Sequence, residues 1–264
     1  MVEVRLSWVC GAVQAVRLEQ RFDFEVMGGF MRTVRMLAGV AGLGLVAMAL
    51  LGRTRGAAVT NALDSLHGLE AVNGKAEITT YRGRRALHLL GWPEQATPDH
   101  PANDASMLAI VTGMDFHNGT IQLEVAGAPR AGAPEDSRGF IGIVFRAQDR
   151  GARGENIYLR PTNGRADDQL RRNHSTQYES IPDFRWHRLR KESPGVYESY
   201  ADLDPGAWTK MKIVVSGTKA QLFVNGADQP ALIVNDLKLG ETHGQIGLWA
   251  HKTTEAYFSS LTVK

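Results

Sequence analysis

The chain has 264 residues, of which 43% are hydrophobic, and this is enough apolar material for one sizeable core or two small ones. Lys and Arg number 30 against 28 Asp and Glu, so the formal net charge is only +2, and no long basic run occurs. This balance argues against nucleic acid or another polyanion as the partner. A single cysteine, Cys10, excludes an intrachain disulfide and any paired-cysteine metal or redox site.

The N-terminal region has the pattern of an export signal. A basic stretch, Met31 to Arg35, precedes an apolar run from Met36 to Gly52, and small residues follow at Gly56 to Ala58. These are the parts that a signal peptidase site needs, with cleavage after Ala58. Residues 1–30 mix acidic and basic side chains that a signal does not use, so we expect them to be untranslated or disordered, with translation starting at Met31 or Met27.

A second interpretation keeps residues 31–58 in the mature protein as a membrane anchor. The run of about 17 apolar residues reaches the lower limit for a helix that spans a bilayer, so attachment through residues 36–52 stays open. In both interpretations residues 59–264 form the folded domain and lie outside the cytoplasm, in the periplasm or the extracellular space.

From Lys75 onward apolar residues alternate with polar ones in short runs, and turn-forming pairs such as Asn118-Gly119, Asn163-Gly164 and Asn225-Gly226 separate these runs. This pattern predicts an all-β, two-sheet sandwich with little helix. The expected strands are Ala76–Tyr81, Ala86–Leu90, Ser106–Val111, Thr120–Val125, Phe140–Ala147, Asn156–Pro161, Gln177–Ser180, Phe184–Leu189, Val196–Tyr200, Trp208–Ser216, Ala220–Val224, Ala231–Val234, Gln245–Ala250 and Ala256–Val263.

The same alternation assigns faces to the strands. We expect Ile141, Ile143 and Phe145 to face the core, and in the next strand Ile157 and Leu159 share one side. The opposite faces then carry flat aromatic rings and planar hydrogen-bonding groups, which suit the apolar faces and vicinal hydroxyls of a sugar. The predicted ligand-binding residues on these faces and in the polar loop 167–178 are Arg146, Asn156, Tyr158, Arg160, Arg172, His174, Gln177, Trp186 and Arg188. As an alternative, Trp186 and Phe184 belong to the core and the arginines are solvated strand ends.

The C-terminal segment Gly244-Gln245-Ile246-Gly247-Leu248-Trp249-Ala250-His251 and the Phe-containing last strand resemble the closing strands of concanavalin A-like jelly rolls. They are most similar to the bacterial secreted group of 3-keto-disaccharide hydrolases, and more loosely to laminin-G-type modules. The resemblance implies a jelly roll with a ligand on its concave face, over roughly residues 76–264. Ser259-Ser260 stands where that group has an Arg-Asn pair, so the resemblance leaves the activity open.

No established catalytic motif occurs. The Glu-x-Asp-x-x-Glu strand of laminarinase-type jelly rolls is absent, because Glu124 has no acidic residue two or five positions later. The remaining acid and base candidates are Glu179, Asp183, Glu198 and Asp202. No metal site is expected, since no His-x-His or His-Glu-x-x-His run exists, and no cofactor is expected.

Three functions therefore stay open. The first is carbohydrate binding without catalysis, as in lectins. The second is a glycoside hydrolase acting on 3-keto-disaccharides or related modified sugars. The third is a structural or adhesive surface module.

Overall fold

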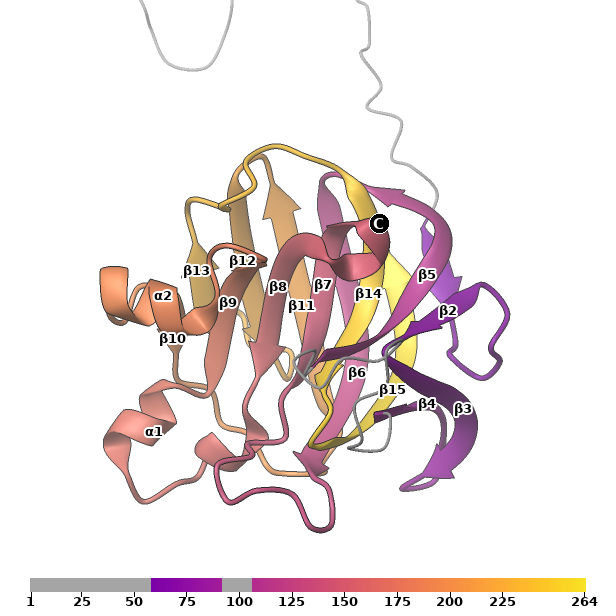
Figure 1. Ribbon diagram of the computed structural model, residues 1–264, viewed down its shortest axis with the longest axis horizontal. Helices are drawn as coiled ribbons and strands as arrows, with labels where there is room; N and C mark the ends of the chain where they lie inside the picture. The colour runs from indigo at the N-terminus through magenta and orange to yellow at the C-terminus, as the bar shows by residue number, and fades with distance from the viewer. Residues whose placement is uncertain (1–57, 92–105) are drawn as a thin grey trace, which may run out of the picture. The chain divides into compact units, whose positions relative to one another are not determined.

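The computed structural model describes residues 58–91 and 106–264 (Figure 1). The predicted start, signal and anchor segments lie in residues 1–57, outside the described residues. Among the described helices, none has the length and apolar character needed to cross a bilayer.

The described residues form two antiparallel sheets that lie face to face (Figure 1). The first has eight strands in the order β13-β12-β11-β6-β15-β4-β3, with β1 paired to β15. Its strands are β1 (Val59–Asn61), β3 (Gly74–Tyr81), β4 (Arg84–Gly91), β6 (Gly119–Pro129), β11 (Thr209–Ser216), β12 (Lys219–Val224), β13 (Leu232–Val234) and β15 (Thr254–Val263).

The second sheet has seven strands in the order β10-β9-β8-β7-β14-β5-β2 and lies nearer the viewer in Figure 1. Its strands are β2 (Leu69–Val72), β5 (Ser106–Phe116), β7 (Ile141–Gln148), β8 (Arg153–Leu159), β9 (Thr176–Ile181), β10 (Glu198–Ser199) and β14 (Gly244–His251). Both sheets contain neighbours that are far apart in sequence, such as β6 beside β15 and β7 beside β14, as in a jelly roll, so the fold depends on long-range pairing.

The core lies between the two sheets, and period-two alternation produces it. Ile141, Ile143 and Phe145 are fully buried there, as predicted, and they pack with Ile157 and Leu159 of the next strand. Strand side chains point alternately to the two faces of a sheet. The residues between these core positions in β7 and β8 therefore point to the outer face of the sheet. The predicted all-β, two-sheet fold is confirmed.

One predicted strand is wrong. Phe184–Leu189 was expected to be extended, but the chain there enters helix α2 (Trp186–Glu192). Leu189 is its one buried residue, and Arg188 pairs with Glu192 one turn later at 2.8 Å. Apolar alternation over so few residues does not separate a strand from one face of a helix, and Arg, Leu, Lys and Glu favour the helix.

Three further short elements lie beside the seven-stranded sheet. They are the 3-10 turns η1 (Asp149–Gly151) and η2 (Pro161–Asn163) and the helix α1 (Gln169–Asn173). Helix α1 falls in the segment predicted to be a loop, and Asp168 caps it by accepting a hydrogen bond from the backbone N–H of Arg171 at 2.8 Å. Helices α1 and α2 both lie at the β9 side of the molecule (Figure 1).

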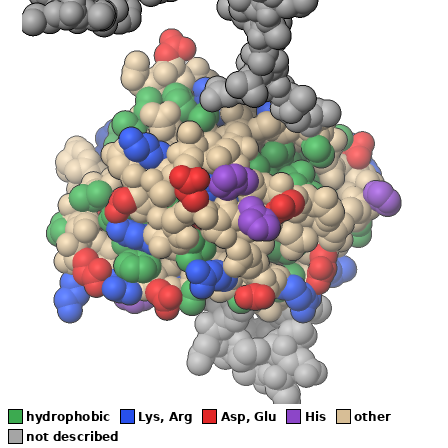
Figure 2. All heavy atoms as spheres, turned by 90° about the horizontal axis from the view of Figure 1, so that it is seen from above, with side chains coloured by type: hydrophobic (Ala, Val, Ile, Leu, Met, Phe, Trp, Pro, Cys, Tyr) green, Lys and Arg blue, Asp and Glu red, His purple; other side chains and the backbone are tan. Residues whose placement is uncertain are grey.

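The outer face of the seven-stranded sheet is apolar over much of its area. A second buried cluster covers it, made of Val72, Leu108, Ile110, Val144, Ala147, Tyr158, Ile181 and Trp249. By contrast, the end of the sandwich seen in Figure 2 shows acidic, basic and histidine side chains mixed with small apolar patches. The outer face of the seven-stranded sheet therefore carries a buried apolar cluster of its own, whereas a sheet face turned to solvent is normally polar.

Candidate functional site

A cavity of about 590 Å³ lies on the outer face of the seven-stranded sheet. Its wall comes from strands β8, β9 and β14, from helices α1 and α2, and from the segment before β7. The lining side chains are aromatic (Phe140, Tyr158, Trp186, Trp249), basic (Arg138, Arg160, Arg171, Arg185, Arg190, Lys252), acidic (Asp136, Glu179), imidazole (His174, His251) and small or amide (Pro134, Ser137, Asn163, Thr253).

Two aromatic rings form part of the floor. Tyr158 on β8 and Trp249 on β14 both pair with Gly142 on the intervening strand β7. Because Gly142 has no side chain, the two rings meet above it, with centroids 4.9 Å apart and planes tilted by 37°. The two rings are 2% and 3% exposed, and they give the floor of the cavity an aromatic character.

Arg160 organises the polar side of the floor. Its Nη2 donates to the hydroxyl of Tyr158 at 3.1 Å and to Oε1 of Gln177 at 2.9 Å. Its Nη1 donates to the backbone carbonyl of His174 at 3.2 Å. Arg160 is 4% exposed, so these bonds fix a guanidinium that would otherwise be costly to bury.

Two buried carboxylates lie on the outer face next to each other. Glu179 accepts hydrogen bonds from Nδ2 of Asn156, from Nε of Arg185 and from the backbone N–H of Trp186, each at 3.1 Å. The last bond places the carboxylate at the first turn of α2.

Glu198 on β10 pairs directly with Gln177 of β9, so it is diagonal to Glu179 on the same face. Its carboxylate accepts two hydrogen bonds from Arg190. Nε donates to Oε1 at 3.0 Å, and Nη2 donates to Oε2 at 2.6 Å. Nε2 of His174 lies 3.2 Å from Oε1 of the same carboxylate, the oxygen that Nε of Arg190 also contacts. Glu198 therefore holds both a wall arginine and a wall imidazole in place.

The two histidines of the cavity are neutral near pH 7. Burial lowers the pKa of His174, although Glu198 opposes that shift. Burial, with a smaller effect of Lys252, lowers the pKa of His251 to about 4. Nδ1 of His251 lies 2.8 Å from Oγ1 of Thr253 and 3.3 Å from the backbone nitrogen of the same residue. Nε2–H of His174 donates to Glu198, so the free lone pair of the His174 ring is on Nδ1.

A second cavity of about 580 Å³ adjoins the first one, and Arg185 and Trp249 line both. Its other lining includes the apolar side chains of Val72, Leu108 and Ile181. Asp149 and Arg150 also line this second cavity, so both cavities combine apolar and charged side chains.

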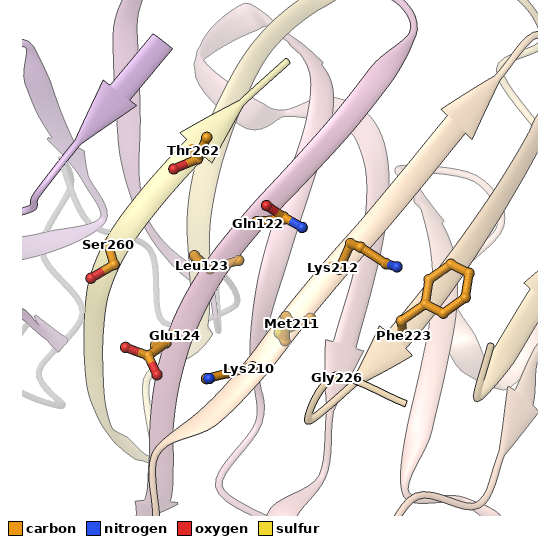
Figure 3. Close-up of a pocket in the computed structure, with 10 residues that line it drawn as sticks. All are labelled: Gln122, Leu123, Glu124, Lys210, Met211, Lys212, Phe223, Gly226, Ser260 and Thr262. Carbon is orange, nitrogen blue, oxygen red and sulfur yellow. The ribbon is translucent and has the colours of Figure 1, made fainter. Parts of the chain in front are cut away.

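A smaller cavity of about 320 Å³ lies on the outer face of the other sheet (Figure 3). Leu123 and Met211 belong to the core, while Lys212 extends toward the ring of Phe223 (Figure 3), with Nζ 3.8 Å from the centroid. The one aromatic ring of this cavity is thus already covered by a cation. The cavity at Tyr158 and Trp249 is the better candidate for a ligand site.

The structure brings five of the predicted site residues to the candidate cavity. Tyr158, Arg160, His174, Trp186 and Glu179 line it, and Trp186 is 41% exposed. Asn156, Gln177 and Glu198 are buried directly behind the lining and hydrogen bond to it. The alternative is therefore wrong for Trp186, whereas Phe184, which it also placed in the core, does pack against the inter-sheet core.

The other predicted residues lie elsewhere. Arg172 donates to the hydroxyl of Tyr200 at 3.1 Å, away from the cavity lining. Arg188 pairs with Glu192 along α2. Asp202 pairs with Arg165 at 3.0 Å on the surface, and Asp183 is exposed and contributes only its carbonyl, to Arg188.

The prediction that Arg146 binds the ligand on the outer face, which was based on alternation, is wrong. A bulge in β7 places Arg146 at φ 52°, and its side chain is 0% exposed. The guanidinium donates to the carbonyls of His117, Gly217 and Gly240 at 2.9, 2.8 and 2.7 Å, and to Oδ1 of Asn118. The bulge interrupts the alternation of side chains along β7 and redirects the side chain of Arg146. Its guanidinium therefore joins three loops at one end of the sandwich.

Several lining residues were not predicted from the sequence, among them Trp249, His251, Arg138, Arg171, Arg185 and Arg190. Trp249 and His251 belong to the C-terminal segment that carries the resemblance, and their alternation with the core residues Leu248 and Ala250 was a usable signal. The arginines come from turns and short helices, where no periodic pattern marks the side that faces a ligand.

Comparison with known proteins assigns the fold and the family. A structure from Bacillus subtilis, described as a protein of unknown function with a galectin-like fold, superposes with a TM-score of 0.52 at 14% identity, over 78% of this chain and 94% of that one. The carbohydrate-binding module CBM66 from Bacillus subtilis superposes with a TM-score of 0.49 at 12% identity, over 75% and 96% of the two chains. Comparison with curated protein sequences finds no match. The model of the 3-keto-alpha-glucoside-1,2-lyase-like domain matches residues 86–264, which span all the lining of the candidate cavity, and the chain belongs to this family.

Proposed function

We propose that the chain binds a saccharide in the cavity on the outer face of the seven-stranded sheet. The observation that carries this proposal is the pair of rings of Tyr158 and Trp249, which meet over Gly142 at the floor of the cavity. Sugar rings pack their C–H faces on such aromatic surfaces, while hydroxyl groups need planar donors and acceptors around the edge. Arg160, His174 and Asn163 supply these groups in the lining.

Family membership favours a second function, elimination at a 3-keto-glucoside. In such a sugar the ketone makes the hydrogen on C2 acidic. A base removes that proton, a C1–C2 double bond forms, and the C1–O bond breaks with its electron pair on the glycosidic oxygen, which takes up a proton. The reaction needs a base and an acid in the site and no redox partner.

The cavity offers both groups. His174 is neutral, and its Nε2–H faces Glu198 at 3.2 Å, so Nδ1 is available as the base. Tyr158 stays protonated because burial raises the pKa of its phenol. Since Nη2 of Arg160 donates to its oxygen, the phenol hydrogen is left to donate elsewhere and can serve as the acid.

Methyl 3-keto-α-D-glucopyranoside and methyl α-D-glucopyranoside test both functions. Calorimetric titration of either sugar is expected to show binding, and Trp249→Ala is expected to abolish it. Methanol released from the 3-keto sugar, followed by proton NMR, reports elimination. Binding without methanol supports saccharide recognition alone, and binding of neither sugar refutes the proposal.

A pair of histidine variants separates the two functions. If methanol is released, His174→Gln is expected to slow its release by at least about 100-fold. His187→Gln is the matched control, because His187 is exposed on α2 and outside the lining. Equal rates in both variants would exclude His174 as the base.

The export that the sequence predicts is part of the same proposal. The basic, apolar and small-residue segments of residues 31–58 support it, with cleavage after Ala58 or retention through residues 36–52. Fractionation of the native host, with N-terminal sequencing of the recovered chain, tests it. Intact protein in the cytoplasm would contradict both forms of export.

A further inference from the structure

The lining of the candidate cavity has an excess of positive charge. Six basic side chains and two acidic ones line it. Glu179 is matched by Arg185 at 3.1 Å, and Glu198 behind the wall is matched by Arg190 at 2.6 Å. These two pairs account for both buried carboxylates, so they leave arginines in the wall whose charge they do not neutralise.

Arg138 and Arg171 are the clearest of these arginines. Within the described residues neither forms an ion pair with a carboxylate. Arg138 donates through Nη1 to the carbonyls of Glu135 and Ser137, at 2.6 and 3.1 Å. Arg171 makes one long bond, from Nε to Oδ1 of Asn163 at 3.4 Å. Most of the donor groups of both guanidiniums are therefore left for a ligand.

The two arginines also act on each other. The pKa of Arg138 is lowered, chiefly by burial and next by repulsion from Arg171, while Asp136 and Glu135 oppose the shift. Like charges held near each other in a cavity are costly unless an anion joins them. The neutral imidazoles of His174 and His251 do not alter this balance near pH 7.

The position of this charge is specific. Arg138, Arg171 and Asn163 line the first cavity and not the adjoining one, whose lining includes Val72, Leu108 and Ile181. The adjoining cavity also contains arginines, but these are paired: Arg150 with Glu70 at 2.8 Å and Arg185 with Glu179 at 3.1 Å. A charged substituent on a sugar at the floor would therefore find arginines without a carboxylate partner at the Arg138 end.

We infer that the site selects a saccharide that carries a negatively charged substituent, a carboxylate or a sulfate ester, and that Arg138 and Arg171 bind this group. The inference rests on the proposed function, because it names the substrate class of the same cavity. Guanidinium groups bind both substituents through paired N–H donors.

Calorimetric titrations with three methyl glycosides test the inference, namely methyl α-D-glucopyranoside, methyl α-D-glucopyranosiduronate and methyl α-D-glucopyranoside 6-sulfate. At least one of the two anionic sugars is expected to bind about tenfold to 100-fold more tightly than the neutral sugar. Which one binds more tightly identifies the carboxylate or the sulfate. The preference is expected to shrink as salt concentration rises.

Matched variants assign the effect to the two arginines. Arg138→Gln and Arg171→Gln are each expected to reduce the ratio of anionic-sugar affinity to neutral-sugar affinity severalfold. Arg165→Gln is the control, since Arg165 is an exposed arginine paired with Asp202 and Asp204 outside the cavity.

The failures of the two proposals are distinguishable. Equal or weaker binding of both anionic sugars, with the neutral sugar bound, overturns the inference and leaves the proposed function standing. A preference that survives in both arginine variants also overturns it. Binding of none of the three sugars overturns the proposed function and the inference together.

Discussion

The rings of Tyr158 and Trp249 lie 4.9 Å apart although a whole strand, β7, separates the strands that carry them. Gly142 makes this contact possible, because it is the residue of β7 that pairs with both. A backbone position with no side chain thus joins two strands into one aromatic floor. The first prediction follows from this relationship.

Gly142→Ala is expected to lower the free energy of unfolding by about 1 to 3 kcal/mol. A Cβ at this position would lie 2.3 Å from the carbonyl oxygen of Ile157 and 2.5 Å from Cα of Tyr158, both of them backbone atoms. Urea denaturation measures the loss. Gly247→Ala is the control, since its Cβ would meet only side-chain ends of Leu108 and Ile110, at 3.0 Å. A loss no larger than in the control would contradict the steric argument.

Trp186→Ala is expected to weaken saccharide binding about tenfold while lowering the free energy of unfolding by less than about 1 kcal/mol. Trp186 is 41% exposed at the start of α2, so its removal leaves little cavity in the core. Calorimetry measures the affinity for the saccharide, and thermal denaturation measures the stability of the fold. Tyr200→Ala is the matched control, because Tyr200 is 42% exposed and outside the lining. Unchanged affinity in Trp186→Ala would remove this ring from the site.

Arg146→Lys is expected to lower the free energy of unfolding by about 2 to 4 kcal/mol, without a direct effect on saccharide affinity. Lysine keeps the charge, but one ammonium group cannot reach carbonyls in three loops that a planar guanidinium bonds together. Arg165→Lys, at an exposed ion pair, is expected to change stability by less than about 0.5 kcal/mol. Weaker sugar binding by the folded Arg146→Lys variant would contradict this prediction, because it would show that the hydrogen bonds of Arg146 to the three loops also affect the candidate site.

Stability is expected to fall as the pH falls from about 6.5 to about 4, because of His251. Burial lowers the pKa of this imidazole to about 4 in the folded chain, against an ordinary value of 6.5. Between these values the unfolded chain binds a proton that the folded chain does not bind. The stabilisation that comes from neutral His251 is therefore fully present above pH 6.5. The free energy of unfolding falls by about 2 to 3 kcal/mol as the pH decreases from there toward 4.

Urea denaturation at several pH values checks this dependence in the native chain and in His251→Gln, which is expected to flatten it. His243→Gln serves as the comparison, because His243 is an exposed residue paired with Asp115. A slope that persists unchanged in His251→Gln would assign the acid sensitivity to other groups.

Alternation in the sequence was sufficient to predict the sandwich and its core. Ile141, Ile143 and Phe145 were placed correctly because a strand in a two-layer fold must turn every second side chain inward. The same rule placed Tyr158 and Arg160, two positions later, on the face opposite to the core, and both line the cavity. It failed at Arg146, where the bulge in β7 changes the direction of the side chain.

Sequence alone thus determined the all-β class, the buried faces and the residue types that suit a sugar. Tertiary structure decided which strands are neighbours, and with that the contact of Tyr158 with Trp249 over Gly142. It also brought Arg138, from the segment before β7, to the same cavity as Arg171 and His174, which lie in α1 and at its C-terminal end. The physical reason is that side-chain direction follows from a local period of two, whereas strand order and loop position follow from long-range pairing, which no local pattern records.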